Sequence, residues 1–276
     1  SKPAITSALI FRKQDGKNSG CIVFTNIRPV ILSADNAITT DIAGIIVQQL
    51  EKKLECPVIF HTMPACDVSL KIETADLAST KRVGTRIAQQ LLSEIKRARY
   101  SKLEKAYAYS LKTDMPMKAE CKLPVSTLSE KAERYSEQIK ELKNIDLDIP
   151  DKGELLNRTI RYASFALRND SAGNNEIPLI MGLRLDTMSI FYLPGATTIS
   201  TADSLTRLMP QTILLASGLN GMHDAILPDE AFDEGGWWAS VSSYTKGAEK
   251  ELLKSMNSLV ASTFPRIFKK RLLKAE

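Results

Sequence analysis

The chain has 276 residues, of which 43% are hydrophobic and 25% are charged. These proportions are typical of a globular protein and exclude a collagen, a coiled-coil rod and an intrinsically disordered chain. Its longest apolar runs fall well short of the roughly 18 residues that a membrane-spanning helix needs, so we predict no transmembrane segment. The formal net charge of +5 is spread along the chain and does not predict a nucleic-acid partner.

The first hundred residues predict alternating strands and helices. Apolar segments over 8–11 and 21–24 flank Asp15-Gly16, which is the pattern of a hairpin. A helix should begin at the N-cap candidates Thr39, Thr40 and Asp41 and should bury one face, formed by Ile42, Ile45, Ile46, Leu50 and Leu54. Residues 57–60 predict a strand buried on both faces by helices, and 82–99 predict a second helix. This order predicts an α/β fold of mixed sheet layers covered by helices.

The rest of the chain predicts an insertion followed by further strands. Residues 105–123 look extended, with a break at Pro116, and two charged helices over 126–143 and 152–168 form a helical insertion at 126–169. We expect one domain over 1–276. The remaining predicted elements are a hairpin over 178–193 that turns at Asp186-Thr187, a helix ending near 205–209, a strand over 212–216, a polar loop over 218–236 and a last helix over 252–260.

Four cysteines and a basic tail give no specific function. Cys21, Cys56, Cys66 and Cys121 form no C-x-x-C pair and no dense disulfide framework, so we expect buried structural thiols. The tail over 266–274 alternates cations with apolar residues. We interpret it as a final helical turn whose cations complement the helix dipole, in preference to a contact with an anionic surface.

Three loops follow predicted strands, where ligands collect in open α/β sheets. The loops cover 25–36, 61–69 and 218–238, and they contain motifs in a fixed order. These are Phe24 to Val30 with Asp35-Asn36, then Cys66-Asp67-Val68-Ser69, then Leu193-Pro194-Gly195-Ala196, then Asn220-Gly221 and Glu230 to Trp237.

This series resembles the neutral/alkaline non-lysosomal ceramidase family, zinc amidases that hydrolyse N-acyl sphingosine. Family members carry N-F-A-C-H-P-T…D-N, G-D-V-S-P-N, L-P-G-E and N-G-Y-I-G-Y-L-P-T…E-A-Y-E-E-G-G-Y in the same order. The resemblance runs through most of the chain. It implies the fold of the family's catalytic domain, or of its carboxyl-terminal portion, and an extracytoplasmic or secreted setting.

The resemblance also implies that the zinc ligands are missing. The family's metal-binding histidine falls on Arg28, its glutamate on Ala196 and its tyrosine on Ala225, while its first zinc histidine would lie upstream of Ser1. Zinc needs three or four nitrogen, oxygen or sulfur ligands. Two methyl groups supply none, and a guanidinium repels the metal. We therefore predict no metal and no cofactor at this site.

Ser69 stands where the family has its candidate nucleophile. It would need a base, for which His61 and His223 are the only histidines, and an orienting carboxylate such as Asp67 or Asp224. The interpretation we prefer is structural: Ser69 caps a turn, His61 ends a strand and His223 lies on an exposed loop.

We expect a degenerate, non-catalytic or strongly diverged ceramidase-like domain. A cleft around Arg28, Asp67, Ser69 and Asn220, with His61 and His223 as further ligand-binding candidates, would take a small anionic or lipid-like molecule. The alternative is an amide or ester hydrolase that acts on N-acyl lipids through Ser69 or a rearranged metal site. A third interpretation is a piece that pairs with an upstream segment. The sequence predicts no oligomeric state.

Overall fold

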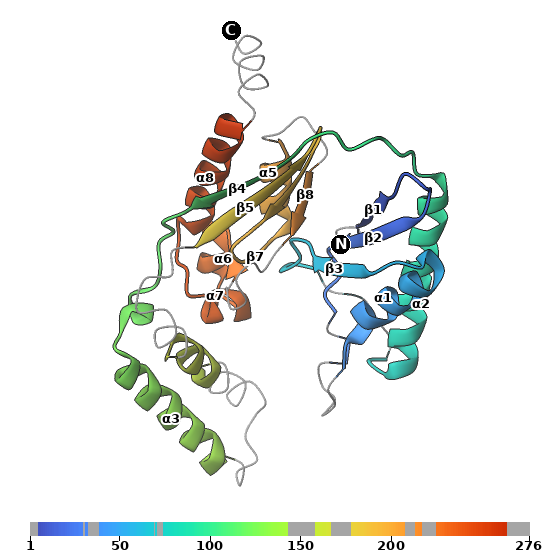
Figure 1. Cartoon of the computed structure of the whole chain (residues 1–276). Helices are drawn as coiled ribbons and strands as arrows, with labels where there is room; N and C mark the ends of the chain where they lie inside the picture. Colours follow the sequence, from blue (N-terminus) through green and yellow to red (C-terminus); the bar gives the residue numbers. More distant parts are fainter. Residues whose placement is uncertain are drawn as a thin grey trace. The chain divides into compact units, whose positions relative to one another are not determined.

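A computed structural model describes residues 5–29, 31–32, 39–68, 70, 74–142, 158–166, 178–207, 213–216 and 225–263. Its helices and strands confirm the predicted mixed α/β class (Figure 1). The residues fall into two compact units. The first unit consists of 1–107, 183–191 and 211–217, and the second consists of 108–182, 192–210 and 218–276. The single domain expected over 1–276 stays a prediction.

The first unit contains a three-stranded sheet in the order β1-β2-β3. β1 (Thr6–Arg12) and β2 (Asn18–Thr25) pair antiparallel, which confirms the predicted hairpin. The turn between them uses Gly16 with a φ of +85°, a left-handed conformation that glycine adopts without strain. β3 (Val58–Thr62) pairs parallel with β2. The carboxyl ends of β2 and β3 therefore lie at the same edge of the sheet.

Two helices pack against each other beside this sheet. α1 (Asp41–Leu54) begins where the sequence predicted it, and α2 (Leu77–Arg97) begins five residues earlier than the predicted 82. The earlier start has a local cause, because the Asp76 side chain caps α2 by accepting the Ser79 amide proton at 2.6 Å. At Gly84 an added Cβ would lie 2.9 Å from the Ile45 Cβ, so glycine permits the close helix approach.

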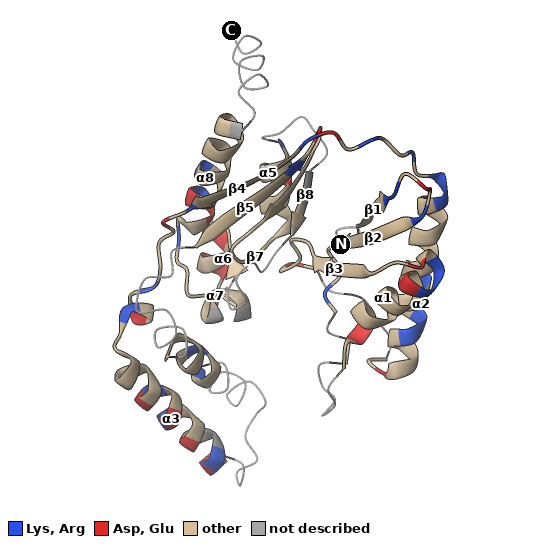
Figure 2. Ribbon diagram, viewed as in Figure 1, with Lys and Arg blue, Asp and Glu red and all other residues tan. Residues whose placement is uncertain are grey.

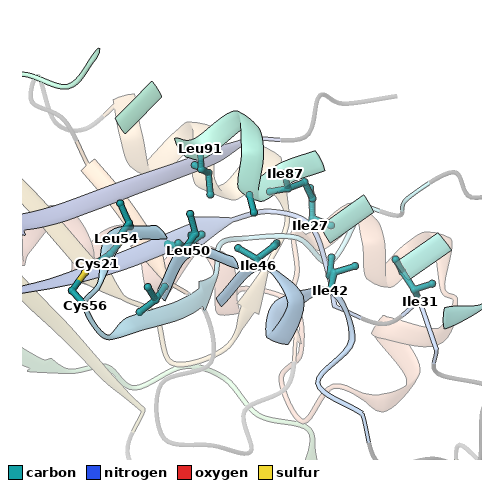
Figure 3. Close-up of a cluster of buried hydrophobic side chains, with 13 residues drawn as sticks. Cys21, Ile27, Ile31, Ile42, Ile46, Leu50, Leu54, Cys56, Ile87 and Leu91 are labelled. Atoms are coloured by element: carbon teal, nitrogen blue, oxygen red, sulfur yellow. The ribbon is translucent and has the colours of Figure 1, made fainter. Parts of the chain in front are cut away.

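The helices and the sheet share one apolar core (Figure 3). The predicted face of α1 supplies Ile42, Ile46, Leu50 and Leu54 to it, which confirms the periodicity argument for these four. The fifth predicted residue, Ile45, is only partly buried and lies against Gly84 of α2. The expectation that strand 57–60 is buried on both faces is wrong, because Ile59 is 53% exposed. Successive side chains of a strand point to opposite faces, and only the Val58 side joins the core. The buried members are Cys21, Val23, Ile27, Ile31, Ile42, Ile46, Leu50, Leu54, Cys56, Val58, Ile87, Ala88 and Leu91.

A four-stranded sheet has the order β4-β5-β6-β8, and its residues are divided between the two units. The strands are β4 (Ala106–Lys112), β5 (Leu179–Leu185), β6 (Met188–Tyr192) and β8 (Ile213–Ala216). The predicted hairpin turn at Asp186 is confirmed, and the predicted strand over 212–216 is present as β8. The Asp186 carboxylate also accepts the amide protons of Glu104 at 3.1 Å and Lys105 at 2.9 Å.

The second unit contains a small parallel pair, β7 (Ala196–Thr197) and β9 (Ala225–Ile226). Four helices accompany it: α5 (Ile199–Arg207), α6 (Asp229–Glu234), α7 (Trp237–Val241) and α8 (Ala248–Thr263). The predicted helix end near 205–209 and the last helix are confirmed in α5 and α8. The polar loop expected over 218–236 is only partly correct, since β9 and α6 lie within it.

The predicted insertion is helical in its described parts. A 3₁₀ turn η1 (Ala119–Lys122) leads into α3 (Val125–Leu142), and residues 158–166 form a second helix. Residues 143–157 and 167–169 lie outside the described residues. Both helices contribute to one apolar cluster, in which the rings of Tyr135 and Tyr162 stack at 5.7 Å. Acidic and basic residues alternate along α3 (Figure 2).

Two cations, one just before the insertion and one within it, bind the carboxyl-terminal end of α7. The Lys118 ammonium donates to the carbonyl oxygens of Ala239 at 2.6 Å and Ser240 at 3.2 Å. The Arg161 guanidinium donates to the same Ser240 oxygen at 2.8 Å. The last carbonyls of a helix have no partner within the helix, and positive charge is favourable there. We call Lys118 and Arg161 the α7 clamp.

No helix in the described ranges has the length and apolar character needed to cross a bilayer. The basic tail over 266–274 lies beyond the last described residue, so its predicted helical turn stays a prediction.

Candidate functional site

The shared edge of β2 and β3 carries the candidate residues of the first unit. Thr25 is opposite Thr62 at the end of the pairing, and the Met63 amide donates to the Thr25 carbonyl oxygen at 2.7 Å. The loops that follow the two strands therefore leave from adjacent points. One loop carries Arg28 and the other carries Asp67, as the sequence predicted for ligand-binding loops beyond strand ends.

The loop before Arg28 is fixed by buried hydrogen bonds. Asn26 is 2% exposed, and its side-chain oxygen accepts the backbone amide proton of Ile5 at 2.6 Å. The backbone amide of Asn26 in turn donates to the Ile5 carbonyl oxygen at 3.1 Å. The buried Thr25 hydroxyl accepts the Ile27 amide proton at 3.2 Å. These contacts hold the backbone on the amino-terminal side of Arg28, which is itself half-buried. The sequence did not indicate this role of Asn26.

The charges of Arg28 and Asp67 both act on the buried Cys66 thiol. Burial raises the pKa of the Cys66 thiol to about 12, the positive charge of Arg28 opposes that rise, and the negative charge of Asp67 adds to it. Cys66 is buried and Asp67 is exposed. A thiol with so high a pKa is no nucleophile at neutral pH. The arrangement thus offers a cation beside a buried neutral thiol, which suits binding better than covalent chemistry.

His61 lies on β3 directly opposite Phe24 of β2. Its ring stacks on that of Phe24 with centroids 5.7 Å apart and an interplanar angle of 24°. Burial lowers the pKa of His61, so the neutral imidazole is favoured. The expected position at the end of a strand is confirmed. Three other candidates, Ser69, Asn220 and His223, lie outside the described residues, so the proposed triple around Ser69 and the full cleft stay predictions.

In the second unit the two alanine positions are neighbours. β7 and β9 pair in parallel with Ala196 opposite Ala225, so the structure brings together two positions that the resemblance assigns to one metal. Ala225 is fully buried, and its carbonyl oxygen accepts a 2.7 Å hydrogen bond from the Ser242 hydroxyl. Ala196 is half-buried. Arg28 belongs to the first unit and these alanines to the second, so the three-position arrangement stays a prediction.

The side chains of the two paired alanines do not fit zinc. Methyl groups have no electron pair to donate, and the Ala225 carbonyl oxygen already accepts a hydrogen bond. Within the described ranges, no group of three or more His, Cys, Asp or Glu side chains is arranged to hold a metal ion.

Comparison with known proteins bears on the fold. No protein-family profile and no curated protein sequence matches the chain. Among solved structures, a ceramidase complexed with C2 has a TM-score of 0.65 at 11% identity, over 95% of this chain and 48% of that chain. A neutral ceramidase from Pseudomonas aeruginosa has a TM-score of 0.61 at 14% identity, over 92% of this chain and 46% of that chain.

These similarities show a diverged ceramidase-like fold, as the motif order predicted. The chain spans about half the length of the two ceramidase structures that it matches.

Proposed function

We propose that this chain is a ceramidase-like domain that has lost the family's zinc site and binds an anionic, lipid-like ligand through Arg28. The observation that carries the proposal is the direct pairing of Ala196 with Ala225. At two adjacent positions where the resemblance places a glutamate and a tyrosine, the chain has only methyl groups.

Arg28 supplies the recognition chemistry. A guanidinium presents a planar set of donors that matches a carboxylate or a phosphate, and such charge-assisted hydrogen bonds are stronger than neutral ones. Arg28 is half-buried and lies two residues after Asn26. Because hydrogen bonds fix Asn26, the backbone leading to Arg28 is already positioned before a ligand binds. A pre-formed donor loses less conformational entropy on binding than a mobile one does.

The metal component is tested by measuring zinc. The full chain is incubated with excess zinc chloride, separated from free metal by gel filtration, and analysed by mass spectrometry of the metal. We expect well below one zinc ion per chain. Retention of one zinc ion per chain would refute the loss of the site.

The ligand component is tested with chain-matched probes. Isothermal titration calorimetry should detect dodecanoate and dodecyl phosphate but not dodecanol, which has the same tail without the charge. Arg28→Gln should weaken dodecanoate binding on the order of ten-fold, since one charge-assisted pair is removed. Arg86→Gln, which removes an exposed cation of α2, is the control and should bind normally.

A substitution of Asp67 should change the affinity for dodecanoate in the opposite direction. Its carboxylate acts on the same Cys66 thiol as Arg28, so its negative charge opposes an anion bound at this edge. Asp67→Asn should therefore tighten dodecanoate binding a few-fold. Equal affinity for dodecanol and dodecanoate, or no effect of either substitution, would exclude Arg28 as the anion-binding residue.

The hydrolase alternative has its own assay. We expect no hydrolysis of N-acyl sphingosine or of a chromogenic amide or ester above the uncatalysed rate. Activity that is present in the wild-type chain and absent from Ser69→Ala would replace the binding proposal with an enzyme.

A further inference from the structure

We propose that Cys21 and Cys56 form a structural disulfide that joins β2 to the segment leading into β3. Both thiols are reduced in the structure. The proposal does not depend on the proposed function, because it concerns the scaffold of the first unit and not the ligand.

The strand register brings the two cysteines together. Cys21 is opposite Val58 in the parallel β2–β3 pair, and its amide donates to the Pro57 carbonyl oxygen at 3.0 Å. Cys56 is joined directly to Pro57 and lies two residues before Val58. Cys56 lies in the bend between α1 and β3, and its side chain is buried in the same core cluster as Cys21 and Val58.

The environment of the two thiols agrees with this placement. Cys21 is 2% exposed and Cys56 is 7% exposed, and both belong to the core cluster that contains Leu54. Figure 3 shows both side chains at the same end of that cluster. Burial raises the pKa of Cys21 to about 12, and the nearby Cys56 adds to the rise.

The other two cysteines have different surroundings. Cys66 interacts with Arg28 and Asp67, and Cys121 donates from its thiol to the Ser243 carbonyl oxygen at 3.5 Å in the second unit. Of the four cysteines in the chain, all of which the structure describes, Cys21 and Cys56 are therefore the pair that the fold selects for oxidation.

The bond would form by exchange with a small-molecule disulfide such as oxidised glutathione. One protein thiolate attacks that disulfide, forms a mixed disulfide and expels one thiolate. The second protein thiolate attacks the protein sulfur of the mixed disulfide and expels the other. The protein loses two electrons and two protons, and the small disulfide is reduced to two thiols. Because both thiols are buried and the pKa of each is raised, the reaction should proceed during folding and be slow in the folded chain.

The test begins with the wild-type chain, so that it does not depend on a variant that folds. The full chain is refolded from guanidinium chloride in a glutathione redox buffer, or with dithiothreitol instead. Thiols are then counted in denaturant, and peptides are mapped without reduction. We expect two of the four thiols to be lost and the peptides of Cys21 and Cys56 to be linked. Four free thiols, or a different linked pair, would overturn the proposal.

Stability gives the second measurement. Oxidation should raise the thermal unfolding midpoint by roughly 5–10 °C, because the bond restricts the unfolded chain over the long segment between the two cysteines. Cys21→Ala and Cys56→Ala should each abolish this difference between oxidised and reduced samples. Cys66→Ala and Cys121→Ala are the controls and should retain it. An oxidised wild-type chain that melts no higher than the reduced one would contradict a stabilising bond.

Discussion

The two parallel strand pairs of this molecule differ in what they carry. β2 and β3 pair over five positions. The loops beyond them carry Arg28 and Asp67, whose charges both act on the Cys66 thiol. β7 and β9 pair over two positions, and the first facing pair, Ala196 and Ala225, offers no polar side-chain atom. The two pairs thus share a parallel pairing but differ in the side chains that they present, so the pairing alone does not define the chemistry.

The largest expected effect comes from a substitution in the apolar core that supports the β2–β3 pair. Leu50 is fully buried in the core between α1 and the sheet. Leu50→Ala should lower the free energy of unfolding by about 2–5 kcal/mol, because it loses apolar contacts and leaves a cavity. Urea denaturation followed by circular dichroism measures this change. Leu77→Ala is the matched control, because Leu77 is 68% exposed and its truncation should change little.

The second-largest effect comes from a substitution that tests whether the β7–β9 pair has space for a metal-binding side chain. Ala225 has no exposed surface, so Ala225→Tyr should overpack its surroundings and lower the free energy of unfolding by about 1–3 kcal/mol. Fluorescence of Trp237 and Trp238, the only tryptophans and both in the second unit, follows this unfolding.

Ala196→Glu, at the half-buried partner position, should be tolerated better than Ala225→Tyr. A stable Ala225→Tyr variant that binds zinc together with Ala196→Glu would show that the second pair keeps the space for a metal site.

The smallest effect concerns pH and the first pair. Burial lowers the pKa of His61 below its ordinary value of 6.5, so the unfolded chain takes up a proton first as the pH falls. This contribution to stability is fully present above about pH 7 and is lost progressively below pH 6.5. His61→Phe should preserve the stacking on Phe24 and flatten the decline in unfolding free energy between pH 7 and pH 5. An unchanged slope in that variant would assign the decline to other groups.

Elements with strong local signals were predictable from the sequence. The spacing of Ile42, Ile46 and Leu50 specified the buried face of α1, and the turns at Gly16 and Asp186 specified two hairpins. The two-residue strands β7 and β9 have no periodicity of their own, so the pattern around 218–236 indicated only a loop. The exposure of Ile59 depends on which face of β3 the helices cover, and no local pattern records that.

In the candidate site, too, some features were predictable from the sequence and others depend on tertiary contacts. The motif order supplied Arg28 and Asp67, and His61 was expected at the end of its strand. The electrostatic effect of Arg28 on Cys66 depends on the parallel pairing of β2 with β3, which brings together two loops that are separate in the sequence, whereas Asp67 directly follows Cys66. The pairing of Ala196 with Ala225 and the meeting of Cys21 with Cys56 likewise follow from tertiary register. Ser69, Asn220 and His223 lie outside the described residues and stay predictions.

The α7 clamp has a practical consequence for anyone who wishes to shorten the chain. Excising the helical insertion would remove Arg161 together with the apolar side chains that the 158–166 helix adds to its cluster, and of the α7 clamp only Lys118 would remain. Ser242, just past that turn, holds the backbone of Ala225, so the disturbance would spread to the β7–β9 pair. A trimmed variant should therefore keep the 158–166 helix and confine its deletion to residues 143–157.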